Sequence, residues 1–167
     1  MDRWSYTINN NNINENNAEV TIFGNKMKIK LSPSKKSSFT HVFLDTDTKE
    51  ANGYVCKENY NKKKCSGGES VEYTDYYIKT PLDWLNEEDF LEAQVDRSRK
   101  KQIGGRSSVV AIVVSKGDEI YNYWFDDTKY GGGLLEIEIY KDNNLVSSTK
   151  YLMNQIPDNV REENALP

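Results

Sequence analysis

Three short apolar runs near the C-terminal end constrain the fold of this chain more than any other feature. They cover residues 109–114, 120–125 and 134–140, and each is rich in β-branched or aromatic side chains. Polar or glycine-rich segments at 116–118 and 131–133 separate them. Runs of this length and composition, divided by turn residues, are typical of consecutive antiparallel strands. The region therefore predicts a β-meander.

Strand-like segments also precede this region. Residues 18–31 predict a hairpin that turns at Gly24-Asn25, and its second arm alternates lysine with apolar residues. That period of two places three lysines on one face and apolar side chains on the other. Residues 39–44 and 71–78 fit further strands. We expect an all-β or β-dominated α+β fold, an antiparallel β-sandwich or open barrel of about eight to ten strands with one short helix.

The expected helix begins at Asn86. This residue can cap a helix, and the acids at 87–89 suit the positive end of the helix dipole. However, Leu91, Ala93 and Val95 alternate with polar residues, which also fits a strand. We predict a short helix here and keep the strand as the alternative.

Length and composition favour one globular domain with polar ends. The chain has 167 residues, enough for a real core, but only 37% of them are hydrophobic. We predict an N-terminal arm with an Asn-rich loop over residues 1–18, a β-rich domain over 19–152 and a polar tail over 153–167. Arms of this kind often become ordered on a neighbouring chain. The pattern therefore favours a protein partner or self-association through the terminal arms.

The charge of the chain is low overall but uneven. A formal net charge of −4 gives no general reason to expect nucleic acid or an anionic membrane as a partner. The segment 97–106 nevertheless holds five cations and no acid, and such a loop can contact phosphates. A nucleic-acid-binding β-domain is therefore the alternative function. Its candidate anion-binding residues are Arg97, Arg99, Lys100, Lys101 and Arg106.

Aromatic residues crowd the middle run of the meander and the loop after it. Their alternation places aromatic side chains on both faces of one strand, so both faces are expected to be covered. Core packing is the simplest interpretation, and a surface that binds carbohydrate, peptide or bases is the other. The candidate binding residues are Tyr121, Tyr123, Trp124 and Tyr130.

Residues suited to catalysis or metal binding are few. The single histidine, His41, lies within an apolar segment and is expected to pack there. Asp45 and Asp47, at alternate positions of a polar loop, and Asp127 are the candidate ligands of a divalent cation, the one cofactor we consider. A metal-dependent enzyme that uses strand carboxylates such as Glu136 is the third functional hypothesis.

The two cysteines predict a disulfide across a hairpin loop. Cys56 and Cys65 close a short segment, and in the chain-entropy model such a bridge stabilises by roughly 2.7 kcal/mol. Two free thiols in a reducing compartment are the alternative. A zinc site is not expected, because the spacing lacks a second cysteine pair and His41 is distant in sequence.

No motif in the chain names a substrate. No window approaches ~18 consecutive apolar residues, and the N-terminus has no signal-peptide pattern, so we expect a cytoplasmic protein or part of a released particle. The leading hypothesis is a non-catalytic structural or interaction module that acts through protein–protein assembly, for example in a virion or a surface complex.

Overall fold

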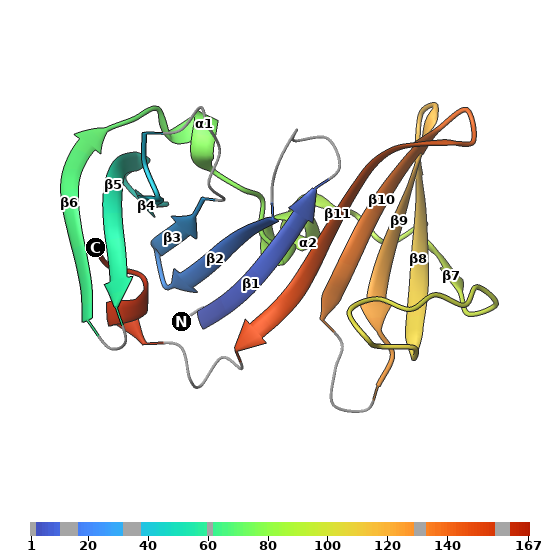
Figure 1. The fold of residues 1–167 in the computed structure, drawn as a ribbon. Coiled ribbons are helices and arrows are strands. Elements are labelled where there is room, and N and C mark those ends of the chain that lie inside the picture. Colours follow the sequence, from blue (N-terminus) through green and yellow to red (C-terminus); the bar gives the residue numbers. More distant parts are fainter. Residues whose placement is uncertain (1–2, 11–16, 32–37, 60–61, 129–132, 156–160) are drawn as a thin grey trace. The chain divides into compact units, whose positions relative to one another are not determined.

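Antiparallel strands dominate the computed structural model of this chain (Figure 1). It describes residues 3–10, 17–31, 38–59, 62–128, 133–155 and 161–167. The 11 strands account for 58% of these described residues, and the two α-helices among them are short. The expected β-dominated, antiparallel fold is confirmed, and its sheet is open rather than closed.

The chain divides into two compact units, each described by itself below. Unit 1 comprises Met1–Ile8, Glu15–Ile78 and Met153–Pro167, and unit 2 comprises Asn9–Asn14 and Lys79–Leu152. Most of the predicted N-terminal arm and all of the predicted tail fall within unit 1, although residues 11–16 and 156–160 lie outside the described residues.

The strands of unit 1 follow one another in sheet order, each antiparallel to the next from β2 to β6. In β3 the lysines are half-buried while Met27 and Ile29 are buried, which confirms the predicted alternation. Val20, Ile29 and Val42 have no exposed surface and form the centre of this unit. The elements are β1 (Arg3–Asn10), β2 (Asn17–Phe23), β3 (Lys26–Lys30), β4 (His41–Asp45), β5 (Glu50–Asn59), β6 (Lys62–Ser70), α1 (Tyr73–Tyr76) and the 3-10 helix η2 (Glu162–Asn164).

Unit 2 contains the predicted β-meander, which is confirmed. Its strands lie in the order β11-β10-β9-β8-β7, and each pair is antiparallel. The elements are α2 (Pro81–Glu87), β7 (Gln94–Asp96), β8 (Val109–Lys116), β9 (Glu119–Asp126), β10 (Leu134–Lys141) and β11 (Asn144–Gln155).

The helix predicted from Asn86 is wrong, because a stronger start signal lies upstream. Thr80 caps α2: its hydroxyl accepts from the backbone N–H of Asp83, and the Asp83 carboxylate accepts from the backbone N–H of Thr80. Pro81 fills the first helical position, where a missing N–H costs nothing. The helix ends at Glu87. The alternative prediction, a strand around Leu91 to Val95, is confirmed in part, because β7 forms at Gln94–Asp96.

The strand expected at 71–78 is also wrong, since α1 forms one helical turn there. Val71 donates its backbone N–H to the carbonyl of Ala51, and the chain then turns. Tyr73 and Tyr77, four residues apart, stack with ring centroids 5.2 Å apart. Contacts at this spacing stabilise a helical turn and override the β propensity of tyrosine.

Candidate functional site

One face of the unit 2 sheet buries polar side chains. Trp124 on β9 lies opposite Glu136 on β10, and Asn122 lies opposite Glu138. Because residues that pair across antiparallel strands point to the same side, these four share one face. Glu136 is only 1% exposed and Glu138 is 7% exposed. Carboxylates at this depth require partners, since an isolated buried charge is costly.

Residues 97–106, which we call the strap, cover this face. The strap is anchored by Ile103, whose side chain is buried and packs against Val109, Ala111 and Trp124. The strap is therefore held against the sheet by the apolar packing of Ile103, although its most obvious feature in the sequence is its positive charge.

The tip of the strap is a tight turn. Ile103 and Arg106 exchange two backbone hydrogen bonds, both of 2.9 Å, across Gly104 and Gly105. The φ angles of these glycines are 54° and 80°, a conformation that residues with a side chain rarely adopt. A Cβ on Gly104 would stand 2.7 Å from the Leu152 side chain. The glycine pair thus allows the strap to approach β11 closely.

Lys101 supplies the charge that the buried carboxylates need. Its ammonium lies 2.8 Å from Glu136 and also bonds Glu138, and it stands 5.2 Å from the centre of the Trp124 ring. The Trp124 indole N–H donates to Glu138 at 2.8 Å, and the Ser148 hydroxyl donates to Glu136 at 2.8 Å. The group is an ion-pair and hydrogen-bond network built from four segments of the chain: the strap, β9, β10 and β11.

Contacts within the network fix the protonation of Lys101 and Glu138. Burial alone would raise the pKa of Glu138, but hydrogen bonds from Lys101 and Trp124 outweigh it and the pKa is lowered. Burial lowers the pKa of Lys101, and the two carboxylates more than reverse this, so that its pKa is raised. Both groups stay charged at neutral pH. Neither is poised to exchange a proton with a substrate.

The other cations of the strap also find carboxylates within unit 2. Arg106 pairs with Asp126, whose side chain is 2% exposed, and Arg97 pairs with Asp127. The structure also pairs Arg99 with Asp96 at 2.9 Å. Of the five candidate anion-binding residues, Lys100 is the one that has no ion pair with a described residue. The candidate phosphate-binding loop is thus largely neutralised by its own fold.

The opposite face of this sheet carries two of the candidate aromatic residues, Tyr121 and Tyr123, and it is covered as well. Tyr123 has no exposed surface; its ring meets Phe90 edge-on, with centroids 5.3 Å apart, and its hydroxyl donates to Glu88. Burial and this hydrogen bond raise the pKa of Tyr123. The Tyr121 hydroxyl donates to Glu119 at 2.9 Å. Tyr123 and Trp124 are thus core residues on opposite faces, and Tyr130 lies outside the described residues.

The candidate metal ligands are not gathered into one site. Asp45 belongs to unit 1, where its carboxylate bonds Lys26 and accepts from the backbone N–H groups of Asp47 and Thr48. Asp127 belongs to unit 2 and pairs with Arg97 there. Among the described residues, no three histidine, cysteine, aspartate or glutamate side chains are placed to hold a metal ion.

The remaining reactive side chains of unit 1 are engaged in its structure. Cys56 and Cys65 face one another across β5 and β6 and form a disulfide. His41 is 2% exposed, with its Nδ1 2.9 Å from the Thr40 hydroxyl, and its ring stacks with that of Phe43. These contacts give His41 the packing role expected from the sequence.

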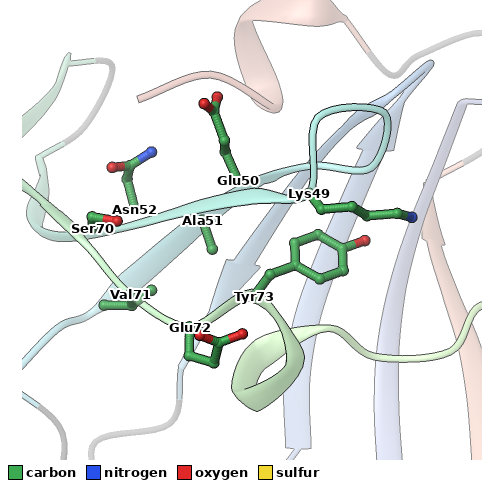
Figure 2. Close-up of a pocket in the computed structure, with 8 residues that line it drawn as sticks. All are labelled: Lys49, Glu50, Ala51, Asn52, Ser70, Val71, Glu72 and Tyr73. Carbon is green, nitrogen blue, oxygen red and sulfur yellow. The ribbon is translucent and has the colours of Figure 1, made fainter.

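Unit 1 also has a shallow cavity of about 320 Å³ that the sequence did not indicate (Figure 2). Ala51 is buried, and the Lys49 ammonium lies 5.2 Å from the centre of the Tyr73 ring. The lining mixes both charges with hydroxyl and amide groups, which does not select one ligand chemistry. It consists of Lys49, Glu50, Ala51, Asn52, Ser70, Val71, Glu72 and Tyr73.

The outer edge of unit 2 exposes apolar side chains. Strand β7 has three residues, is last in the sheet order, and pairs Gln94 with Val113 and Asp96 with Ala111. Val95 is 60% exposed, and Leu91 just before the strand is 91% exposed. We call residues 89–96 the edge segment. The sequence indicated only a short helix or a strand here, and the alternation from Leu91 to Val95 does not show that these side chains are exposed.

Fold and contacts together define a β-dominated, antiparallel protein of two units, one of which has a strap over buried carboxylates. No protein-family model matches the chain, and neither the curated proteins nor the solved structures include a match to it. In the part of the chain that the structure describes, no helix has the length and apolar character needed to cross a membrane.

Proposed function

We propose that this chain is a non-catalytic protein-interaction module that assembles with another polypeptide through the edge segment. One observation carries the proposal: Leu91 and Val95, 91% and 60% exposed, lie at and beside an edge strand. Exposed apolar side chains that gather beside free strand backbone mark interaction sites more often than isolated ones do.

The backbone of β7 adds to this argument. In an antiparallel pair, alternate N–H and C=O groups of an edge strand point away from its neighbour. Among the described residues β7 pairs only with β8, so these groups are available to an added strand. Strand addition gives affinity through the main chain and specificity through alternate side chains such as Val95.

The engagement of the reactive groups supports a binding role over the other two hypotheses. Phosphates would have to displace the carboxylates that already pair with Arg97, Arg99, Lys101 and Arg106. A metal-dependent reaction through Glu136 would have to expel Lys101 from its half-buried position. Breaking these ion pairs costs free energy, which weakens both the nucleic-acid-binding hypothesis and the metal-dependent enzyme hypothesis.

The terminal arms are a weaker choice for the interface. Tyr6 and Ile8 of β1 are 5% and 2% exposed, and Ala165 near the C-terminus is 2% exposed. Buried side chains hold these segments in their own chain. We therefore assign the contact with a partner to the edge segment.

Photo-crosslinking tests this proposal. A benzophenone amino acid replaces Leu91 in one sample and Leu145, which is 46% exposed in the same unit, in the control. Each full-length protein is irradiated alone and in a lysate of its source, and adducts are identified by mass spectrometry. We expect a protein adduct from position 91 that Val95→Lys suppresses and position 145 does not give. Equal adducts from both positions, or none from position 91, would overturn the proposal.

A further inference from the structure

We propose that the partner at the edge segment is a second copy of this chain, with β7 paired antiparallel to β7 of that copy about a two-fold axis at Val95. This inference rests on the proposed function and names its partner. A two-fold interface uses the same surface twice, so the edge segment must be complementary to itself. The charges around β7 meet that condition.

Charge of opposite sign flanks Val95 on its two sides. Asp89 and Glu92 precede β7 and are exposed, whereas Arg97, Arg99 and Lys100 follow it and are exposed. In an antiparallel pair, residues equally distant from the axis on opposite sides face one another. The acidic side of one copy, which holds Glu92, then lies towards the basic side of the other, where Lys100 has no ion pair with a described residue. The same contact occurs twice, once on each side of the axis.

The alternative arrangements lack this complementarity. A parallel pairing would place acidic positions beside acidic positions and basic beside basic, and like charges across strands are destabilising. At the axis the antiparallel pairing sets Val95 against its own copy, so the most exposed apolar residue of β7 is covered in the dimer. Charge and apolar surface therefore favour the same register.

The expected dimer is weak. A three-residue strand offers few main-chain hydrogen bonds, and small interfaces belong to the transient class. We expect a dissociation constant of roughly micromolar order that rises with salt, because exposed charges are screened over about 10 Å at 0.1 M ionic strength.

Charge reversal tests the register. Glu92 and Lys100 are exposed and make no ion pair with a described residue, so changing them leaves the strap contacts intact. Glu92→Lys and Lys100→Glu should each weaken dimerisation by about ten-fold in sedimentation equilibrium. The double variant Glu92→Lys/Lys100→Glu should return close to the wild-type constant, because it restores opposite charges across the axis. Glu69→Lys on β6 makes the same charge change in unit 1 and is the control.

The outcomes separate this inference from the proposed function. Rescue by the double variant, with Glu69→Lys unchanged, supports the two-fold pairing. Additive weakening without rescue, or a chain that stays monomeric at high micromolar concentration, overturns it. A crosslink from position 91 to a different protein would then uphold the interaction role while excluding a second copy as its partner.

Discussion

The two units pair their strands in the same antiparallel way but bury different kinds of side chain. Unit 1 centres on apolar side chains such as Val20, Ile29 and Val42, none of which has exposed surface. Unit 2 buries Glu136 and Glu138 and pairs both of them with Lys101 from the strap. Apolar packing tolerates small errors, whereas a buried charge that loses its partner keeps its full desolvation cost. The stability of unit 2 therefore depends on a few specific ion pairs, whereas that of unit 1 depends on apolar packing.

The two outer strands differ in a similar way. Strand β6 carries lysines at 62–64, and its glycines Gly67 and Gly68 have φ angles of 111° and 103° beside a register shift. Lysines and bulges are common protection against edge-to-edge pairing. Strand β7 has neither and presents Val95 instead. This difference is the reason that we assign the interface to unit 2.

The largest expected effect on stability comes from replacing one ion-paired lysine by methionine in each unit. Lys101→Met should destabilise unit 2 by about 3 kcal/mol, because it leaves buried Glu138 without a cation and buried Glu136 with only Lys150, 3.9 Å away. Lys26→Met in unit 1 removes a cation that is 37% exposed, and it should cost less than about 1 kcal/mol. Amide hydrogen exchange, followed on peptides from each unit, measures both. Equal losses of stability in the two variants would show that unit 2 does not depend on its ion pair more than unit 1 does.

A compensating variant sharpens this test. In the Lys101→Met background, Glu136→Gln with Glu138→Gln removes both buried negative charges while nearly preserving side-chain volume. Part of the lost stability should return, because the desolvation cost of the carboxylates is gone. Further destabilisation would mean that the network acts through packing rather than through charge.

The next effect concerns the disulfide of unit 1. Cys56→Ser with Cys65→Ser should reduce the stability of unit 1 by roughly 2.7 kcal/mol, the chain-entropy value for so short a loop. Hydrogen exchange should accelerate in β5 and β6, while the β8–β10 peptides of unit 2 keep their wild-type rates. Equal acceleration in those peptides would show that the two units unfold together.

The two tryptophans of unit 2 give a smaller contrast. Trp124 donates its indole N–H to the charged Glu138, whereas Trp84 donates to the neutral hydroxyl of Tyr151, both at 2.8 Å. Hydrogen bonds to charged groups are the stronger class, so Trp124→Phe should cost about 2 kcal/mol and Trp84→Phe about 1 kcal/mol. Urea denaturation measures the difference. A reversed order would show that ring packing, rather than the charge of the acceptor, sets the cost.

Local patterns were readable from the sequence, and contacts between distant segments were not. The β-meander and the lysine alternation follow from side-chain periodicity, which acts over a few residues. The strap differs, because Lys101 meets Glu136 and Glu138 from 35 and 37 positions earlier in the chain. Nothing in a run of cations shows that distant carboxylates will neutralise it. The position of α2 was predictable, since its Thr80–Asp83 capping box is itself a local signal.

The smallest expected effect is a pH response in unit 1. Asp45 is a partly solvated group whose hydrogen bond with Lys26, aided by backbone N–H donors, lowers its pKa from 3.8 to about 2. A lowered pKa in the folded state means that the unfolded chain takes up the proton more readily. The resulting stability is present above about pH 4 and is lost as the pH falls towards 2.

Asp45→Asn should remove this response from unit 1. An asparagine oxygen can still accept from the backbone N–H groups of Asp47 and Thr48, so the turn itself should survive the change. Hydrogen exchange in unit 1, measured from pH 5 downwards, should show a smaller loss of protection in the variant, and added salt should shrink the difference because the pair with Lys26 is exposed to solvent. An identical acid response in both proteins would show that burial elsewhere, and not this pair, governs the acid sensitivity of unit 1. The contrast with the enclosed carboxylates of unit 2 would then be one of packing alone.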